Sequence, residues 1–373
     1  MINRREFVAM AGGVAVAGCG GASGGSATTG SGSSVTSYQG PTRWEVRPFA
    51  GYNHGNVDGT GTAAQFEGID GMAFDAAGQL YVADVFNNNI RKISPDAVVS
   101  TLAGAPYGVS GSADGTGTGA YFDGPTALAL HPNGRFYVAD GGRVRECSTD
   151  GKVRTIAGVA SVPGFADGHG TAALFRTLTD LAVDNQGHLL VTDNGNLVIR
   201  QVTTGGDVTT VVGTQCFPDP LGNADGTGLS AQFNYLESLV FNPNDGMIYV
   251  CAQHAIRQID PSNWAVRTIA GVSDRPGFQD GTGTGARFSS PSGLALDAYG
   301  RLFVADGANN CVRMLTPDGV VKTIQNTYVD GTALPYDEFA LPSALVFDGS
   351  GNLYVAKNEV GIRSYIVKYR PLD

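Results

Sequence analysis

An Asp-Gly pair that recurs six times is the feature that most constrains this chain. The spacing between successive pairs runs from 50 to 58 residues. A period of this size indicates stacked copies of one supersecondary unit. The pairs begin at Asp58, Asp114, Asp167, Asp225, Asp280 and Asp330. Each of the first five precedes a small-residue turn and a phenylalanine, whereas Phe339 in the sixth copy follows a turn that contains proline.

Each copy contains short apolar runs separated by turn residues. In the copy from 266 to 319, the runs lie at 266–271, 293–297, 302–306 and 311–315. They are rich in Val, Ile and Leu, are four to six residues long, and show no sustained helical period, so they predict strands. The third run of every copy carries an arginine: Arg91, Arg145, Arg200, Arg257, Arg313 and Arg363.

Four antiparallel strands in each of six copies predict an all-β fold, a six-bladed β-propeller of four-stranded antiparallel blades. The last copy has only three strand runs, and the missing one is found near the other end of the chain, at 44–49. We therefore expect the N-terminal strand to complete the sixth blade, which leaves no sheet edge open. Residues 41–373 then form a single domain.

The segments 70–93 and 293–313 resemble NHL repeats, and the resemblance extends over about 44–370. It implies the propeller fold strongly and an activity only weakly. NHL-type propellers include binding scaffolds, and related six-bladed propellers include lactonases and lyases. A fold alone does not choose among these functions.

The first 19 residues have the features of an export signal. Arg4 and Arg5 precede a short apolar run, and the sequence Val16-Ala-Gly-Cys19 resembles a bacterial lipobox, in which Cys19 would carry the lipid. The arginine pair also resembles a twin-arginine signal, and cleavage after Ala17 without lipidation is the alternative. Residues 20–40, rich in Gly, Ser and Thr, predict a flexible tether. We expect an exported, membrane-anchored lipoprotein of the bacterial cell envelope, periplasmic or on the cell surface.

Charge and cysteine spacing exclude several classes of function. The net charge of -10 argues against a nucleic-acid partner, because phosphate binding needs clustered Lys and Arg. The cysteines at 147, 216, 251 and 311 lack C-x-x-C spacing, which argues against zinc and thioredoxin-like sites. We expect a monomer.

The position that opens each inner strand is polar in all six copies: Asp70, Thr126, Thr179, Glu237, Ser292 and Ser343. These side chains should ring the mouth of the central channel. Asp70 and Glu237 belong to the first and fourth blades, on opposite sides of the ring, and Asp180 lies one residue further along in the third blade. All three acids are candidate ligand-binding residues. Asp70 and Glu237 are candidate ligands for calcium, a hard cation that carboxylates bind. The alternative is a hydrated rim of the channel.

The fourth copy departs most from the repeat. It has Cys251-Ala-Gln-His254 where other copies have Ala-Asp, so Gln253 and His254 are candidate ligand-binding residues. Cys216 lies in the preceding loop, and a Cys216–Cys251 disulfide in an oxidising compartment would shape a pocket beside them. The alternative is two separate buried thiols.

Two functions stay open at this point. The first is a binding or scaffold module for a protein or glycan ligand on the face that carries the long loops between blades. The second is a lactonase- or lyase-like enzyme with a metal at the channel mouth. The Asp-Gly pairs themselves we interpret as structural, because they occur in every copy.

Overall fold

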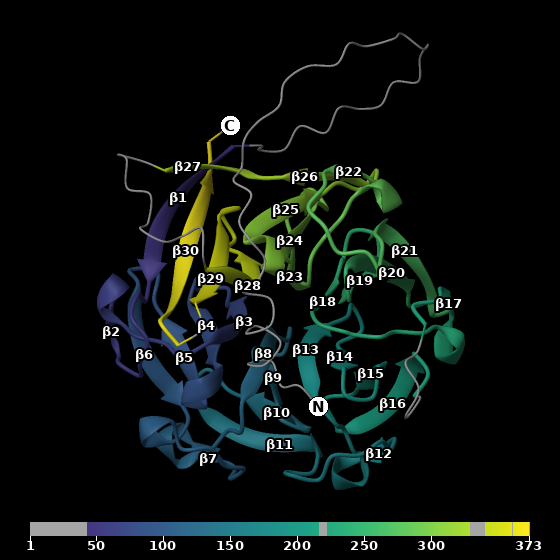
Figure 1. The fold of residues 1–373 in the computed structure, drawn as a ribbon. Coiled ribbons are helices and arrows are strands. Elements are labelled where there is room, and N and C mark those ends of the chain that lie inside the picture. Colours follow the sequence, from purple (N-terminus) through teal and green to yellow (C-terminus); the bar gives the residue numbers. More distant parts are fainter. Residues whose placement is uncertain (1–42, 216–221, 329–339, 360, 373) are drawn as a thin grey trace, which may run out of the picture.

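The computed structural model describes residues 43–373, apart from 216–221, 329–339, 360 and 373. Six sheets form a ring of blades around a central channel (Figure 1). This confirms the all-β, six-bladed propeller predicted from the sequence. Within the described part of the chain, no helix is long and apolar enough to cross a membrane.

The blades follow one another in chain order, and the last-named strand of each lies at the inner edge of its sheet. Blade one contains β2 (Gly59–Thr60), β6 (Val98–Ala103), β5 (Asn89–Ile93), β4 (Leu80–Asp84) and β3 (Ile69–Phe74). Blade two contains β7 (Gly115–Thr116), β11 (Lys152–Gly158), β10 (Arg143–Cys147), β9 (Phe136–Asp140) and β8 (Pro125–Leu130). Blade three contains β12 (Gly168–His169), β16 (Asp207–Val212), β15 (Val198–Val202), β14 (Leu189–Asp193) and β13 (Leu178–Val183).

The second half of the ring has the same order. Blade four contains β17 (Gly226–Thr227), β21 (Ala265–Gly271), β20 (Ala255–Asp260), β19 (Ile248–Ala252) and β18 (Leu239–Phe241). Blade five contains β22 (Gly281–Thr282), β26 (Val320–Thr323), β25 (Cys311–Leu315), β24 (Leu302–Asp306) and β23 (Pro291–Leu296). Blade six contains β27 (Gln325–Tyr328), β1 (Arg43–Ala50), β30 (Arg363–Pro371), β29 (Leu353–Glu359) and β28 (Leu341–Phe347).

Single turns of 3-10 helix connect some of these strands. They are η1 (Gly61–Ala63), η2 (Val85–Asn87), η3 (Pro106–Gly108), η4 (Gly117–Gly119), η5 (Gly170–Ala172), η6 (Gly228–Ser230), η7 (Gly283–Gly285) and η8 (Gly307–Asn309).

The N-terminal strand closes the ring, as the sequence predicted. β1 pairs antiparallel with β30, from Trp44 opposite Pro371 to Ala50 opposite Ile366 (Figure 1, purple beside yellow). The Trp44 side chain is 1% exposed, and its ring lies edge-on to Phe303 of blade five. The two ends of the described chain are thus joined in one sheet.

Each blade has five strands rather than the expected four. The long segment between blades does not stay on one face, because its Asp-Gly pair runs along the outer edge of the next blade, where β2 pairs with β6. Asp58 fixes this segment by accepting hydrogen bonds from the backbone N–H and the hydroxyl of Thr101, both at 3.1 Å. Blades two to five repeat the arrangement. The first five Asp-Gly pairs are therefore structural, as interpreted from their recurrence.

A fully buried arginine joins the outer and inner halves of most blades. In blade one, Arg91 donates to Asp58 at 2.6 Å and to the buried Asp84 at 2.8 Å, and its guanidinium lies over the Phe66 ring. Blades two, three and five have the same bridge. In blade four, Ala252 takes the place of the buried aspartate, and the carboxylate that Arg257 contacts is Asp225 at 2.8 Å.

Blade six corrects the expectation that Arg363 is the sixth member of this set. In the sheet register, Val82 pairs with Arg91, and the matching pair in blade six is Val355 with Val367. Arg363 lies four residues earlier, at the start of β30, because β29 and β30 are longer than their counterparts. The sixth Asp-Gly pair, at Asp330, lies outside the described residues.

Candidate functional site at the mouth of the central channel

In blades one, two, three and five, a β-bulge turns the first polar residue of the inner strand toward the channel mouth. The register between β3 and β4 breaks between Ile69 and Gly71, which leaves Asp70 as the extra residue. Breaks at the same place leave Thr126, Thr179 and Ser292 outside the regular pairing. A bulge re-aims a side chain that would otherwise follow the alternation of the strand.

The hydroxyl members of this ring tie each blade to the next. Each donates a hydrogen bond to a backbone carbonyl at the start of the following inner strand. The four bonds are Thr126 to Leu178 at 3.2 Å, Thr179 to Leu236 at 3.1 Å, Ser292 to Pro342 at 2.9 Å and Ser343 to Ile69 at 2.6 Å. In blades one and four the position holds Asp70 and Glu237, and an ionised carboxylate only accepts hydrogen bonds. These two positions therefore depart from the hydroxyl pattern of the other four blades.

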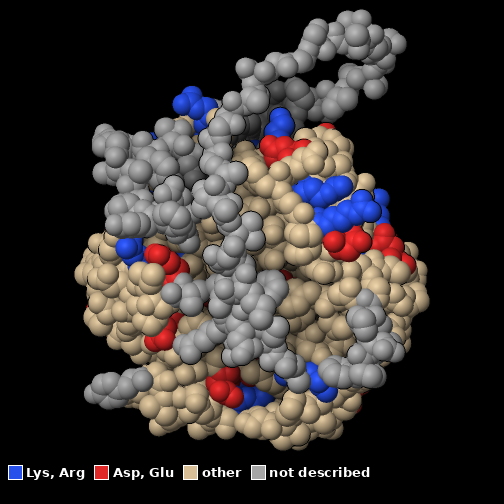
Figure 2. Space-filling model, viewed as in Figure 1, with Lys and Arg blue, Asp and Glu red and all other residues tan. Residues whose placement is uncertain are grey.

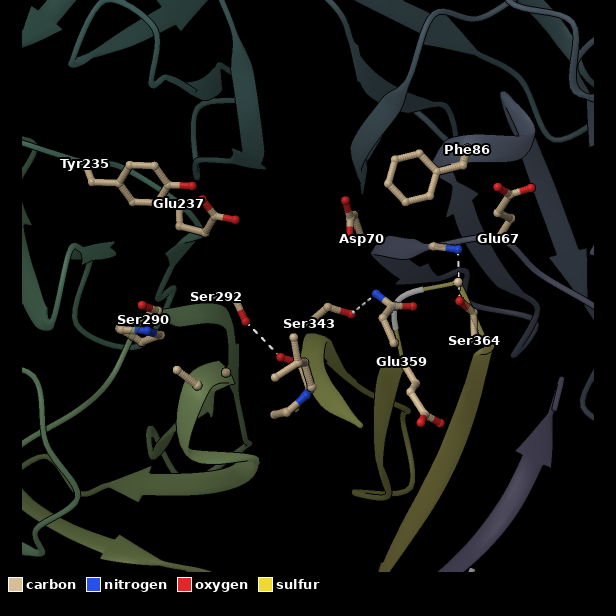
Figure 3. Close-up of a pocket in the computed structure, with 18 of the residues that line it drawn as sticks. Glu67, Asp70, Phe86, Tyr235, Glu237, Ser290, Ser292, Ser343, Glu359 and Ser364 are labelled. Carbon is tan, nitrogen blue, oxygen red and sulfur yellow. Dashed lines mark hydrogen bonds between the residues drawn. The ribbon is translucent and has the colours of Figure 1, made fainter. Parts of the chain in front are cut away.

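A cavity of about 460 Å³ lies at the channel mouth, and a second of about 440 Å³ is the channel itself, lined by the inner strands. Both are lined by Asp70, Glu237, Ser292 and Ser343, so the ring marks the boundary between them. Figure 3 shows Asp70 and Glu237 on opposite sides of the mouth pocket. Of the other two members of the predicted ring, Thr179 lines only the channel, and Thr126 is not among the described residues that line either cavity.

Gln253 and His254 also line the mouth pocket, so four of the five predicted ligand-binding residues are brought together. Both lie in the turn between β19 and β20, where Gln253 takes a left-handed φ of 56°. The Gln253 side-chain oxygen accepts a hydrogen bond from Asn223 at 2.9 Å. The repeat departure in blade four therefore does contribute to a pocket.

The His254 ring has a defined tautomer. Its Nδ1 lies 3.0 Å from the backbone N–H of Ser290, which is a donor, so Nδ1 is the acceptor. Burial lowers the pKa of His254, which favours the neutral ring. A neutral ring that accepts at Nδ1 carries its proton on Nε2. His254 can thus offer a hydrogen-bond donor at Nε2.

Asp180, the fifth predicted residue, lies in the channel and not in the mouth pocket. Its carboxylate accepts hydrogen bonds from the backbone of Leu181 at 2.8 Å and of Leu239 at 2.9 Å. Burial raises the pKa of Asp180 to about 6, and the negative charge of Glu237 adds to the rise. Asp180 therefore joins the inner strands of blades three and four.

Asp180 gives a pH-dependent prediction. Its folded-state pKa of about 6 exceeds the ordinary value of 3.8, so its contribution to stability is full below about pH 3.8 and is lost as pH rises through about 6. The free energy of unfolding of the wild type, minus that of Asp180→Asn, should fall by about 1 kcal/mol between pH 5 and pH 7. Urea unfolding at both pH values measures it, and a difference that grows with pH contradicts it.

Two aromatic residues of the pocket were not singled out from the sequence. Phe86, in η2, is 40% exposed and lies beside Asp70, and Tyr235 lies beside Glu237 on the other side (Figure 3). A comparison of the sequence copies could have identified both residues, because each departs from its counterparts in other blades. The positions that match Phe86 in blades three and five are Gly195 and Ala308, and the position of Tyr235 holds a small residue in blades one, two, three and five.

The predicted calcium site does not fit the geometry of Asp70 and Glu237 alone. They face each other across the pocket, and the described residues contain no group of three or more His, Cys, Asp or Glu that could hold a metal ion. Calcium prefers six to eight oxygen ligands, which two opposed carboxylates do not supply.

Cys251 is a buried thiol in this structure, and burial raises its pKa well above the ordinary value. Cys216 lies outside the described residues, so a bond between the two stays a prediction. The export signal with Cys19 and the tether also lie outside the described residues.

Comparison with known families identifies the repeats. The sequence profile of the Teneurin NHL domain matches residues 44–257, more than half of the chain. The chain therefore belongs to the NHL-repeat propeller family.

Several relatives share this repeat region. Protein SUPPRESSOR OF QUENCHING 1, chloroplastic, from Arabidopsis thaliana is 30% identical over 70% of this chain and 26% of its own length. NHL repeat-containing protein 2 from Homo sapiens is 25% identical over 78% of this chain and 46% of its own length. The chain thus spans less than half the length of these curated relatives.

Solved structures with the same fold have different functions. An auxiliary nutrient binding protein from Bacteroides ovatus has a TM-score of 0.60 at 16% identity, covering 89% of this chain and 78% of its own. Virginiamycin B lyase from Staphylococcus aureus, in complex with quinupristin, has a TM-score of 0.51 at 15% identity, covering 89% of this chain and 96% of its own. A gluconolactonase from Xanthomonas campestris has a TM-score of 0.53 at 15% identity, with coverages of 82% and 86%. At such identities the likeness shows the fold alone.

Proposed function

We propose that this propeller is a ligand-binding module whose site is the pocket at the channel mouth. The proposal rests on one observation. Asp70 and Glu237 occupy the position at which the other four blades have a hydroxyl residue that bonds to the next blade. Departures from a repeat rule mark places where function overrides the structural requirement. Phe86 and Tyr235 are further departures, and they line the same cavity.

The pocket suits a small molecule, or the terminal group of a larger protein or glycan ligand. Its volume of about 460 Å³ lies in the range that small-molecule sites have. The Asp-Gly segments are pinned along the outer edges of the blades, so less of the long loops faces a partner than the sequence alone suggested. A broad scaffold surface is therefore the weaker form of the binding hypothesis.

The lactonase- or lyase-like alternative is less favoured by the groups in the pocket. Because the Nδ1 of His254 accepts from Ser290, its Nε2 holds a proton in the neutral ring and is not poised as a general base. Asp70 and Glu237, two opposed carboxylates, do not by themselves suit a metal. The lyase and gluconolactonase neighbours support the fold and leave this assignment unchanged.

We further propose that the protein is exported and anchored through a lipid on Cys19, with the pocket presented in the cell envelope. This rests on the lipobox-like sequence at 16–19. Membrane fractionation of Cys19→Ser tests the anchor, and a variant that stays with membranes as the wild type does contradicts it.

Ligand screening by thermal shift tests the pocket. A ligand at 100 times its Kd should stabilise the protein by about 2.7 kcal/mol. Phe86→Ala and Tyr235→Ala should each weaken a true hit, because both rings line the cavity. Phe278→Ala is the matched control, since Phe278 is 54% exposed and lies over Arg313 at the outer edge of blade five. A ligand that stabilises both pocket variants as much as the wild type would bind outside this pocket.

A further inference from the structure

A third cavity lies at the end of the blades that is opposite to the mouth pocket. It has a volume of about 410 Å³, and Arg135, Glu146, Lys152 and Arg154 of blade two are among the residues that line it. Thr204, in the turn between β15 and β16 of blade three, forms part of another wall. The mouth pocket is lined by the turn between β19 and β20, which in an antiparallel blade lies at the other end of the strands.

Glu146 holds two of these basic side chains next to each other. Its Oε1 accepts hydrogen bonds from Arg135 at 2.6 Å and from Arg154 at 2.8 Å, and its Oε2 accepts a second one from Arg154 at 2.8 Å. The buried Tyr137 donates to Oε2 at 3.2 Å and accepts from Asn133 at 3.2 Å. A buried carboxylate with donors on both oxygens fixes the direction of both guanidinium groups.

The charges that line this cavity do not cancel. Burial of Glu146 opposes its ionisation, but the hydrogen bonds and charge of Arg154, together with Arg135, outweigh this effect and lower its pKa. Three cations less one carboxylate leave two positive charges in excess. Asp150, in the turn before Lys152, is exposed and is not among the described residues that line the cavity. The lining is therefore positive.

The basic side chains have unused hydrogen-bond donors. A guanidinium group has five N–H groups, and Glu146 accepts from one of Arg135 and from two of Arg154. Among the described residues, none forms a hydrogen bond or ion pair with the Lys152 ammonium. Arg135 and Arg154 are 47% and 52% exposed, so a ligand can reach these donors.

The arrangement is also a departure from the repeat. Glu146 pairs with Tyr137 in the sheet register, and no other blade has an acid at this position. The matching residues are Lys92, Gln201, Gln258, Met314 and Lys368. A positive cavity is unexpected on a chain with a net charge of -10. A local exception to the repeat pattern and to the overall charge indicates a specialised site.

We propose that this cavity is a second binding site, which takes a phosphate monoester. The guanidinium groups of Arg135 and Arg154 and the ammonium of Lys152 bind the phosphate oxygens, and Glu146 positions the two arginines. Two excess positive charges match the dianion of a phosphate monoester better than the single charge of a carboxylate. Arginine forks also fit phosphate geometry. The same phosphate chemistry is found in small soluble esters and in phospholipid headgroups.

Isothermal titration with three small probes tests the chemistry of the site. The probes are glycerol 3-phosphate, glycerol and acetate, used with the full chain at pH 8 and low ionic strength. We expect millimolar or tighter binding of glycerol 3-phosphate, at least about tenfold weaker binding of acetate, and no binding of glycerol. The affinity for glycerol 3-phosphate should fall as salt is raised, because salt screens the attraction.

Variants that remove one charge each test the residues. Arg135→Gln, Lys152→Gln and Arg154→Gln should each weaken glycerol 3-phosphate about tenfold. Arg275→Gln is the matched control, because Arg275 is a 71% exposed arginine beside a carboxylate and does not line the cavity. The control should leave the Kd unchanged. Melting curves show that all four variants fold.

Vesicle sedimentation distinguishes the two sources of the phosphate group. The full chain with Cys19→Ser is mixed with phosphatidylcholine vesicles, either pure or with about 20% phosphatidate. Binding to the phosphatidate vesicles that Lys152→Gln weakens and Arg275→Gln does not would support the site and identify a lipid headgroup as its ligand. Binding of glycerol 3-phosphate without vesicle binding would support the site and identify a soluble ester.

Three results would overturn the phosphate site. They are the absence of binding to both glycerol 3-phosphate and the phosphatidate vesicles, binding of acetate as tight as that of glycerol 3-phosphate, and binding that the three cavity variants leave unchanged. None of these results bears on the mouth pocket, which lies at the other end of the blades and is tested by its own variants.

Discussion

Deletion of β1, residues 43–50, is expected to prevent the protein from folding into a stable monomer. This strand supplies the fourth antiparallel strand of blade six and contributes the buried Trp44, Val46 and Ala50. Its loss would expose β30 along its length, and an open edge of this kind pairs with other chains. We expect aggregation or a large fall in the melting temperature, measured by light scattering and differential scanning calorimetry.

A point substitution gives the same test without shortening the chain. Trp44→Ala should lower the free energy of unfolding by about 3–5 kcal/mol, because the indole is buried between blades five and six. Leu229→Ala, at a side chain that is 59% exposed, is the control and should change stability by less than about 0.5 kcal/mol. A Trp44→Ala protein as stable as that control would mean that β1 does not hold the ring closed.

The architecture was readable from the sequence because every copy repeats the same apolar runs at the same spacing. A strand pattern that is weak in one copy becomes strong evidence when it recurs at the same position in six copies. In blades one to five, the fifth strand was missed because β2 and its counterparts are two residues long, too short to show an alternating pattern. Their position depends on hydrogen bonds from a distant threonine to the aspartate, which no local signal reports.

The assignment of Arg363 failed for a related reason. Alignment of the sequence copies places Arg363 with the other arginines because it follows a β-branched residue. The structurally equivalent position is the residue that faces Val355 across the sheet, and this residue is Val367. Register is a property of paired strands, so a longer hairpin in blade six shifts it without any sign in the local sequence.

The channel mouth was predicted more successfully because its position in each copy is fixed by the repeat. Asp70 and Glu237 stood out by their charge at one aligned position, and the structure places both in one cavity. Phe86 and Tyr235 come from a different turn and a different loop position. Phe86 lies in η2, directly after β4, in the blade that holds Asp70, and Tyr235 precedes Glu237 by two residues, so each aromatic residue lies beside its acid within one blade. The ring of blades then brings the two pairs to opposite sides of one cavity (Figure 3).

Charged side chains of opposite sign lie close together on the face seen in Figure 2. Basic and acidic side chains lie next to one another in small groups on this face, and most of the coloured surface is uncharged. Pairing of this kind also holds the buried arginines, each of which contacts at least one aspartate. Two carboxylates of the mouth pocket have neighbours of the same kind, since Glu67 lies 3.4 Å from His54 and Glu359 lies 3.7 Å from Arg363.

Substitution of a buried arginine is the second change expected to have a large effect on stability. The arginine of blade four, which has no buried aspartate partner, provides the control. Arg313→Met should lower the free energy of unfolding by about 3–5 kcal/mol, because it leaves the carboxylate of Asp306 buried without its ion partner. Arg257→Met removes an equally buried arginine, but the aspartate it leaves behind, Asp225, is 47% exposed. Its cost should be clearly smaller, although both variants lose a contact with an aromatic ring.

The pH dependence of the free energy of unfolding of the two variants distinguishes the cost of an unpaired buried carboxylate from the cost of lost packing. Burial already raises the pKa of Asp306 to about 6, while Arg313 holds it down, so Arg313→Met should raise it further. The cost of the unpaired carboxylate is present above that raised pKa and is relieved as pH falls, since the protonated acid needs no counter-charge. The stability gap between wild type and Arg313→Met should therefore narrow from pH 8 to pH 5, while the gap for Arg257→Met stays nearly constant. Equal gaps with equal pH profiles would show that the aspartate in β24 does not depend on its arginine, and that the bridges stabilise the blades through packing alone.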